Sequence, residues 1–450
     1  MGRLDVATSG GCVEPILRTS ILLVLSSIEN ESCTAVTVTD SARSRVSAVR
    51  GKVSSGLSVS HRPHSTRRKL AMLALSIGGF GIGTTEFASM GLLPDIATTM
   101  GISEPSAGHM ISAYALGVVV GAPTIAALAA RLPRRMLLLA LMVAFTLGNL
   151  GTVFAPSFDE LVVSRFVAGL PHGAYFGVAA LVAAHLAEPG KRAKAVAMVM
   201  MGLSVANVVG VPVATWIGQA LGWRSAFALV AVIGALTVTA LALWMPRLDA
   251  MPTTSPVTEL GALRRSQVWM TLFVGIVGFG GMFAVYTYIA STLTDVAGLA
   301  RALVPIALMI YGLGMVVGNY AGGWLADRYK LKGTFVGLAA TAVSLAVFVV
   351  AAHNPITALL LVFLIGASGS SVVPGLQTRL MDVAEDAQTL AASLNHAAFN
   401  LANAIGAAVG GAVIAAGFGY TAPAAVGSGL AVAGLGVLAT AMWMDKRTTG

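Results

Sequence analysis

Charged side chains are scarce in this 450-residue sequence. Asp, Glu, Lys and Arg make up 10% of it, whereas 56% of the residues are hydrophobic. Soluble globular proteins carry about 25% charged residues, because water must wet their surface. So few charges cannot cover a water-facing exterior, and we therefore expect much of the exterior to face lipid. This excludes a soluble enzyme and a string of soluble domains.

Cysteine is nearly absent, and several enzyme signatures are missing. Cys12 and Cys33 both lie in the polar N-terminal stretch, so neither a disulfide framework nor a cysteine metal site is expected. The sequence contains no phosphate-binding G-x-x-x-x-G-K-[ST] loop, no H-E-x-x-H and no Cys/His cluster. We therefore predict a protein that is not an enzyme and has no metal or cofactor. Its energy must come from a gradient or from its substrate.

The N-terminal stretch differs from the rest of the chain. Residues 1–66 are polar apart from one short apolar run, Ile16 to Leu25. That run is too short to cross a membrane, which takes about 20 residues. No small-residue cleavage site follows it as in a signal peptide. We predict that residues 1–66 form a disordered extension.

Long apolar runs dominate the sequence from Leu70 onward, with short polar breaks between them. Backbone groups in lipid must be hydrogen-bonded internally, and the alternating polarity of barrel strands is absent, so these runs predict helices. We predict an all-α integral membrane protein with twelve transmembrane helices. The predicted spans are 70–94, 107–129, 136–155, 159–185, 195–219, 224–245, 268–293, 302–325, 333–352, 356–378, 389–416 and 423–444.

Lys and Arg are distributed unevenly among the connections between these spans. Alternate connections and the two flanks, counted from residue 67, hold 18 of them, and the opposite connections hold only Arg224 and Arg301. Positive loops stay in the cytoplasm, so we predict cytoplasmic N- and C-termini in a multi-pass protein of the cell inner membrane. The net charge of +9 would suggest nucleic acid in a soluble protein. Here it sets orientation, and we expect the bilayer and no nucleic acid as partner.

The chain also repeats itself. Ala206-Asn207-Val208-Val209-Gly210 matches Ala402-Asn403-Ala404-Ile405-Gly406 at an offset of 196 residues, and two weaker matches occur at nearly the same offset. Parallel repeats of this kind are typical of large secondary transporters. We predict two pseudo-symmetric six-helix halves, 67–245 and 267–450, joined by a cytoplasmic linker at 246–266.

Small residues recur at every fourth position on spans 2, 5, 8 and 11. This spacing places them on one helix face, where two backbones can approach closely. Static packing would explain any one stripe. As a set, the four stripes suggest surfaces along which the two halves meet and rock. They comprise Ala113, Gly117 and Gly121; Gly202, Ala206, Gly210, Ala214 and Gly218; Gly314, Gly318, Gly322 and Ala326; and Ala398, Ala402, Gly406 and Gly410.

Two charged residues lie deep within apolar spans. Glu86 is the only acidic one and Arg165 the only basic one. A charge in hydrocarbon is costly, so such residues usually face a cavity, find a partner or carry a proton. Both lie about 9–12 Å from the outer ends of their spans at 1.5 Å per residue, which allows pairing. They are candidates for proton coupling, and a structural ion pair is the alternative.

Other polar residues within the spans could line a pocket for amphipathic molecules. Hydrogen bonding between helices explains each of them equally well. Asp95, at the outer end of span 1, is explained by a position in a loop. The candidate cavity residues are Tyr114, His172, Tyr175, Tyr286, Tyr288, Gln377, Asn395 and Asn400.

Several motifs resemble the major facilitator superfamily, and within it the twelve-helix drug:proton antiporters related to chloramphenicol-resistance and arabinose-efflux permeases. Thr84-Thr85-Glu86-Phe87 and Gly91 to Ile96 look like the first helix of that group. Arg165 to Gly169 is similar to its arginine-bearing motif. The residues that carry its helix 5 antiporter motif are Gly202, Gly210, Pro212 and Gly218.

The cytoplasmic signature loop of the superfamily is present twice, with differences. In the first half, Ala126, Ala130 and Pro133 stand where glycine, an acid and glycine are expected, and Arg131, Arg134 and Arg135 remain. In the second half, Gly323, Asp327 and Arg328 keep the pattern. The resemblance implies that these residues gate the cytoplasmic side.

The resemblance implies a monomeric exporter that exchanges protons for small hydrophobic or amphipathic compounds by alternating access. Its cavity would be lined mostly by spans 1, 4, 7 and 10. A proton-coupled importer of sugar or nutrient would use the same fold, although the helix 5 motif argues against it. A non-transporting receptor on this fold is the third possibility.

Overall fold

The computed structural model describes residues 65–129, 132–188, 191–248, 261–384 and 387–448. They belong to one compact unit, Pro63–Gly450. Most of the predicted disordered extension, 1–66, lies outside the described residues, but its last two residues begin the first helix, α3 (Ser65–Gly91). No strand occurs in the described ranges.

Twelve helical segments in these ranges are long and apolar enough to cross a membrane, and they match the twelve predicted spans one for one. The fold prediction is therefore confirmed. In the first half the spans are α3, α6 (His109–Leu128), α7 (Arg134–Phe154), α8 (Phe158–Leu186), the continuous α9 (Arg192–Val205), η1 (Ala206–Gly210) and α10 (Val211–Leu221), and α11 (Trp223–Trp244).

The second half repeats this arrangement. Its spans are α13 (Ser266–Thr287), α15 (Val304–Tyr329), α16 (Leu331–Ala351), α17 (Pro355–Ala384), α18 (Gln388–Ala415) and α19 (Ala422–Thr448). Short helices connect the spans: α4 (Leu93–Met100), α5 (Glu104–Ala107), η2 (Ala262–Arg264), α14 (Ile289–Ser291), η3 (Thr292–Val296) and η4 (Arg301–Leu303). Of the predicted linker 246–266, residues 249–260 lie outside the described residues.

Local sequence explains where several spans begin and end. Ser157 precedes α8 and its hydroxyl accepts a hydrogen bond from the backbone N–H of Glu160, as an N-cap does. Gly222 separates α10 from α11 with φ of +90°, a conformation that side chains disfavour. The seventh apolar run is longer than its helix, because α13 ends at Thr287 and the chain continues as α14 and η3.

Span 5 contains one widened turn, the π-helical segment η1. Two residues after its end lies Pro212, which has no N–H to donate to the preceding turn. The N–H of Val211 bonds the carbonyl of Ala206, five residues back, so the turn is one residue wider than in an α-helix. Such turns are frequent at functional sites.

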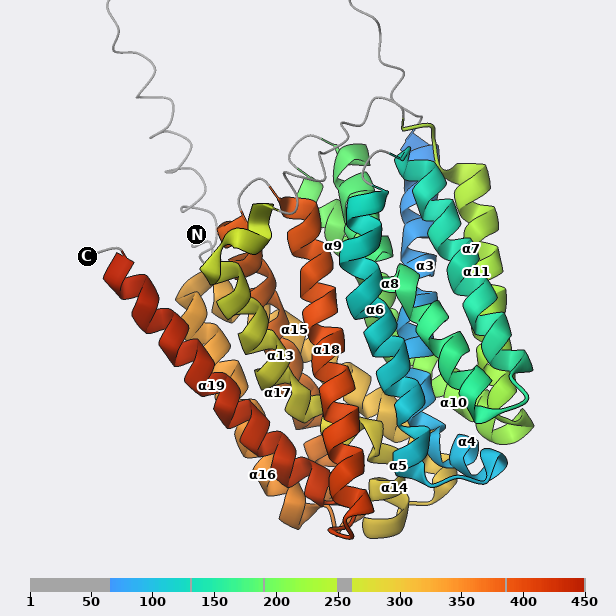
Figure 1. Ribbon diagram of the computed structural model, residues 1–450, viewed down its shortest axis with the longest axis vertical. Coiled ribbons are helices and arrows are strands. Elements are labelled where there is room, and N and C mark those ends of the chain that lie inside the picture. Colours follow the sequence, from blue (N-terminus) through green and yellow to red (C-terminus); the bar gives the residue numbers. More distant parts are fainter. Residues whose placement is uncertain (1–64, 130–131, 189–190, 249–260, 385–386, 449–450) are drawn as a thin grey trace, which may run out of the picture. The chain divides into compact units, whose positions relative to one another are not determined.

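The two halves share a hydrophobic core at one end only. There, one cluster includes Leu93 and Ile96 of α4 together with Tyr286 and Leu308 of the second half. At the other end the core residues form separate clusters, one confined to the first half and two to the second. Figure 1 shows α4, α5 and α14 lying together at the shared end. We call this the closed end.

The small-residue stripes lie within each half. A Cβ on Gly117 would meet the carbonyl of Phe166 on α8, and one on Gly202 would meet that of Ser76 on α3. The stripes on α15 and α18 approach α17 and α13 in the same way, as at Gly318 against Ala367 and Gly406 against Gly280. The interpretation that the two halves meet and rock along these stripes is therefore wrong for this conformation: the stripe glycines pack helices together inside each half.

Candidate functional site

Glu86 lies on α3 between the two halves. Its side chain is 6% exposed. The amide of Asn403, on α18 of the second half, lies beside the carboxylate but forms no hydrogen bond of good geometry, and its nitrogen and oxygen are both buried without a partner. An acid of one half thus faces an unsatisfied amide of the other.

Arg165, on α8, is completely buried and is held by α3. Its guanidinium donates to the hydroxyl of Thr85 at 2.9 Å and to the carbonyl of Thr85 at 3.2 Å. That hydroxyl in turn donates to the side-chain oxygen of Asn149, on α7, at 2.7 Å. No salt bridge within 4 Å joins Arg165 to Glu86 among the described residues, but the two side chains lie close enough for their charges to interact. The arginine holds the residue next to the acid.

A chain of aromatic and polar rings leads from Arg165 to the second half. The guanidinium carbon lies 4.4 Å from the ring centre of Tyr114, on α6. The hydroxyl of Tyr114 lies 3.1 Å from Nδ1 of His172, on α8. His172 faces His396 of α18 with 5.7 Å between ring centres, and His396 stacks on Phe176 at 4.7 Å. Among the candidate cavity residues, Tyr114 and His172 are thus brought to the Arg165 site.

Tyr286, on α13, belongs to an aromatic group next to Glu86. Its ring packs edge-on against Phe87 at 5.5 Å and lies 4.2 Å from the ring centre of Tyr311, on α15. The hydroxyl of Tyr311 is buried without a hydrogen-bond partner. The acid therefore has an aromatic wall from the second half on one side.

The other candidate cavity residues are not gathered at this site. The hydroxyl of Tyr175 donates to the carbonyl of Leu75, and that of Tyr288 donates to the carbonyl of Ala407, so both join helices within one half. Asn400 donates to the carbonyl of His396 one turn earlier on α18. Asn395 is buried on α18, and Gln377 is half-buried on α17.

The helix 5 motif packs against the helix that carries the acid. A Cβ on Gly210 would meet the Thr84 side chain, and one on Gly218 would lie 2.6 Å from a methyl of Leu92. Gly210 thus brings span 5 close to α3 near Glu86, and Gly218 packs against Leu92 just after the end of α3. Pro212 is the second residue of α10, which begins at Val211 directly after the π-helical turn.

The predicted gating residues that the structure describes lie at the end opposite the closed end. Arg131 lies outside the described residues. Arg134 is buried at the start of α7, and Arg135 donates to the carbonyl of Ala242 on α11 at 2.6 Å. In the second half, Asp327 lines a cavity of about 610 Å³, and the Arg328 guanidinium lies 6.0 Å from the Tyr329 ring centre. A Cβ on Gly323 would meet no atom within 4 Å.

Sequence reasoning missed the polar contacts that join the halves at the closed end. Asp95, on α4, forms an ion pair with Arg301, which follows the seventh span. The hydroxyl of Ser291, on α14, donates to the carboxylate of Glu104 at 2.5 Å. Arg301 was visible as one of only two basic residues in the outer connections, which was the available signal.

Comparison with known proteins identifies the family to which this chain belongs. The family model of the Major Facilitator Superfamily matches residues 75–334 and 289–450. The chain belongs to the Major Facilitator Superfamily. It is similar to the inner membrane transport protein YdhP of Escherichia coli strain K12, with 44% identity over 84% of this chain and 96% of that one. It is also 35% identical to the chloramphenicol resistance protein of Streptomyces lividans, over 78% of this chain and 90% of that protein.

Among solved structures, the fold is similar to that of a bacterial homolog of the human lysosomal transporter Spinster. The TM-score is 0.64 at 17% identity, over 84% of this chain and 96% of that one. The Major Facilitator Superfamily chain described here is therefore a multi-pass inner membrane transporter of small molecules, as its family and relatives indicate.

Proposed function

We propose that this transporter exports small hydrophobic or amphipathic compounds in exchange for protons. The observation that carries the proposal is Glu86, an acid buried where the two halves meet. A charged carboxylate is costly in such a place, so a proton must be bound when water is excluded and can leave when the site is wetted. The compound would occupy the same space in the opposite step.

The positive loops favour an orientation with the start of α3 and the end of α19 in the cytoplasm. The closed end is then periplasmic. Partners are protons, the substrate and the bilayer. We infer a monomer with no enzymatic activity and no nucleic-acid partner.

The helix 5 motif and the named function of the Streptomyces relative both favour export of a drug-like compound. Chloramphenicol is therefore the first probe. In everted vesicles energised to an acidic interior, the wild-type protein is expected to release protons when chloramphenicol is added, as reported by a ΔpH-sensitive dye. Glu86→Gln is expected to abolish this release, and Glu86→Asp to retain part of it.

Glu160→Gln is the matched control, because it removes the same charge at the exposed start of α8. It should leave the signal unchanged. Coupled export that survives in Glu86→Gln would remove the acid from the mechanism. Proton-driven accumulation in right-side-out vesicles would instead identify an importer.

A further inference from the structure

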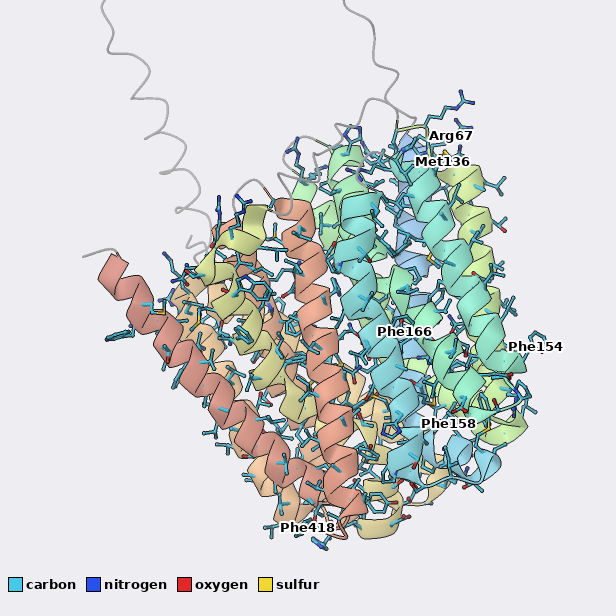
Figure 2. All side chains as sticks on the ribbon, viewed as in Figure 1. Arg67, Met136, Phe154, Phe158, Phe166 and Phe418 are labelled. Atoms are coloured by element: carbon cyan, nitrogen blue, oxygen red, sulfur yellow. The ribbon has the colours of Figure 1, made fainter. Side chains whose placement is uncertain are left out.

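Four basic side chains surround a small cavity in the first half, at the end opposite the closed end. The cavity encloses about 160 Å³ between the starts of α3 and α9 and the end of α8. Figure 2 shows Arg67 of α3 at this same end, opposite Phe158 and Phe418. The charged lining residues are Arg68, Lys69, Lys191, Lys194 and Glu188.

The lining has more positive charge than its own carboxylate can neutralise. Glu188 pairs with Arg68, and with Lys191 at 2.6 Å. Hydrogen bonds from Lys191 and Arg68 lower the pKa of Glu188 to about 2. No described residue makes an ion pair with Lys69 or Lys194. Four cations and one carboxylate leave three positive charges around the cavity.

The remaining walls are apolar. Met72, Leu186 and Met198 line the cavity beside the charges. The membrane-spanning parts of α3 and α9 begin here, at Thr66 and Lys194. The cavity therefore lies where the helices leave the hydrocarbon layer. This environment fits an amphipathic occupant with an anionic head.

We propose that this cavity binds the phosphate of an anionic phospholipid, with its acyl chains along the outside of α3 and α9. Basic pockets between membrane helices bind anionic headgroups, and lysine is a common ligand of phosphate. The larger cavity of the second half is less suited, because Asp327 and Asp382 stand among its three basic residues. The site does not depend on the transport proposal or on orientation, since both leaflets contain phospholipid.

The test is titration of the purified full chain with phosphatidylglycerol, read by native mass spectrometry. We expect the double variant Lys69→Gln/Lys194→Gln to weaken binding of the first lipid at least ten-fold. Lys69→Arg/Lys194→Arg should remain within three-fold of wild type, because it keeps both charges. Lys330→Gln/Lys332→Gln is the matched control: it removes two lysines at the same end of the second half and should also remain within three-fold.

Three results would overturn the proposal. Equal weakening in the control pair would indicate general surface attraction. Equal affinity for phosphatidylcholine would show that anionic charge is not recognised. The third result concerns inorganic phosphate. If its binding also depends on Lys69 and Lys194, and phosphatidylglycerol does not displace it, the occupant is a soluble anion. Gel filtration of each variant establishes that it is folded before titration.

Discussion

The guanidinium of Arg165 donates to both the hydroxyl and the carbonyl of Thr85, the residue that precedes the buried acid on α3. The arginine thus fixes the backbone next to Glu86 without forming a salt bridge to the carboxylate. Because Thr85 also bonds Asn149, three helices of the first half meet at this point. The first half holds its acid in a set position, from which it faces Asn403 of the second half.

Arg165→Lys is expected to lower coupled transport at least ten-fold while the protein still inserts. Lysine keeps the charge, but a single ammonium cannot reproduce the planar fork that reaches both Thr85 oxygens and stacks on Tyr114. Thr85→Val should cause a smaller loss, since the carbonyl acceptor remains. Initial rates in energised vesicles, normalised to membrane content, measure both. Full activity of Arg165→Lys would show that charge alone suffices.

Asp95 and Arg301 form a closing contact between the halves that must break when the closed end opens. Arg301→Ala should therefore favour the open form. The measure is labelling by a membrane-impermeant maleimide of Leu93→Cys, a core position at the closed end, with Cys12 and Cys33 replaced by serine. We expect labelling to rise several-fold in Arg301→Ala.

The charge swap Asp95→Arg/Arg301→Asp provides the control for that experiment. It restores opposite charges, and labelling should fall back toward the wild-type level. The return will be incomplete, because Asp95 lies in the first turn of α4, where a negative charge is favoured by the helix dipole. Unchanged labelling in Arg301→Ala would mean that apolar packing alone keeps this end shut.

The fold could be predicted from the sequence because many residues together indicate it. Twelve apolar runs and a strong bias in loop charge specify spans and a topology without any single residue. Glu86 and Arg165 also stood out, since a charge inside a span is rare. Their partners did not, because Thr85 and Asn149 are ordinary polar residues whose contacts arise only when α3, α7 and α8 pack together.

Two further features depend on packing that the sequence pattern does not encode. A stripe such as Gly202 to Gly218 indicates which face of a helix is smooth, but not which helix it meets, and the partner is α3 of the same half. The internal repeat singled out Asn403, because it aligns with Asn207 in the first half. Only the folded chain shows that one of these two amides lies beside the acid.

Gly202→Val is expected to impair transport strongly, because its side chain would be forced against the Ser76 carbonyl and would separate span 5 from the acid-bearing helix. Overpacking of this kind costs about 1–3 kcal/mol. Gly210→Leu should act in the same way through Thr84 and Phe80. Gly436→Val is the control, since a Cβ there meets no atom within 4 Å. Normal transport by both span 5 variants would show that close approach to α3 is not required.

Glu188 predicts a pH dependence of stability. Lys191 and Arg68 lower its pKa from 4.5 to about 2 in the folded protein. Because the folded pKa is the lower one, its stabilising contribution is present above pH 4.5 and is lost as the pH falls toward 2. The difference in apparent Tm between wild type and Glu188→Gln, followed by tryptophan fluorescence in detergent, should be small but constant from pH 7 to 5.5 and should vanish near pH 2. Other titrating groups cancel, because they are common to both proteins. A difference that disappears above pH 5 would mean that the two cations do not hold this carboxylate ionised.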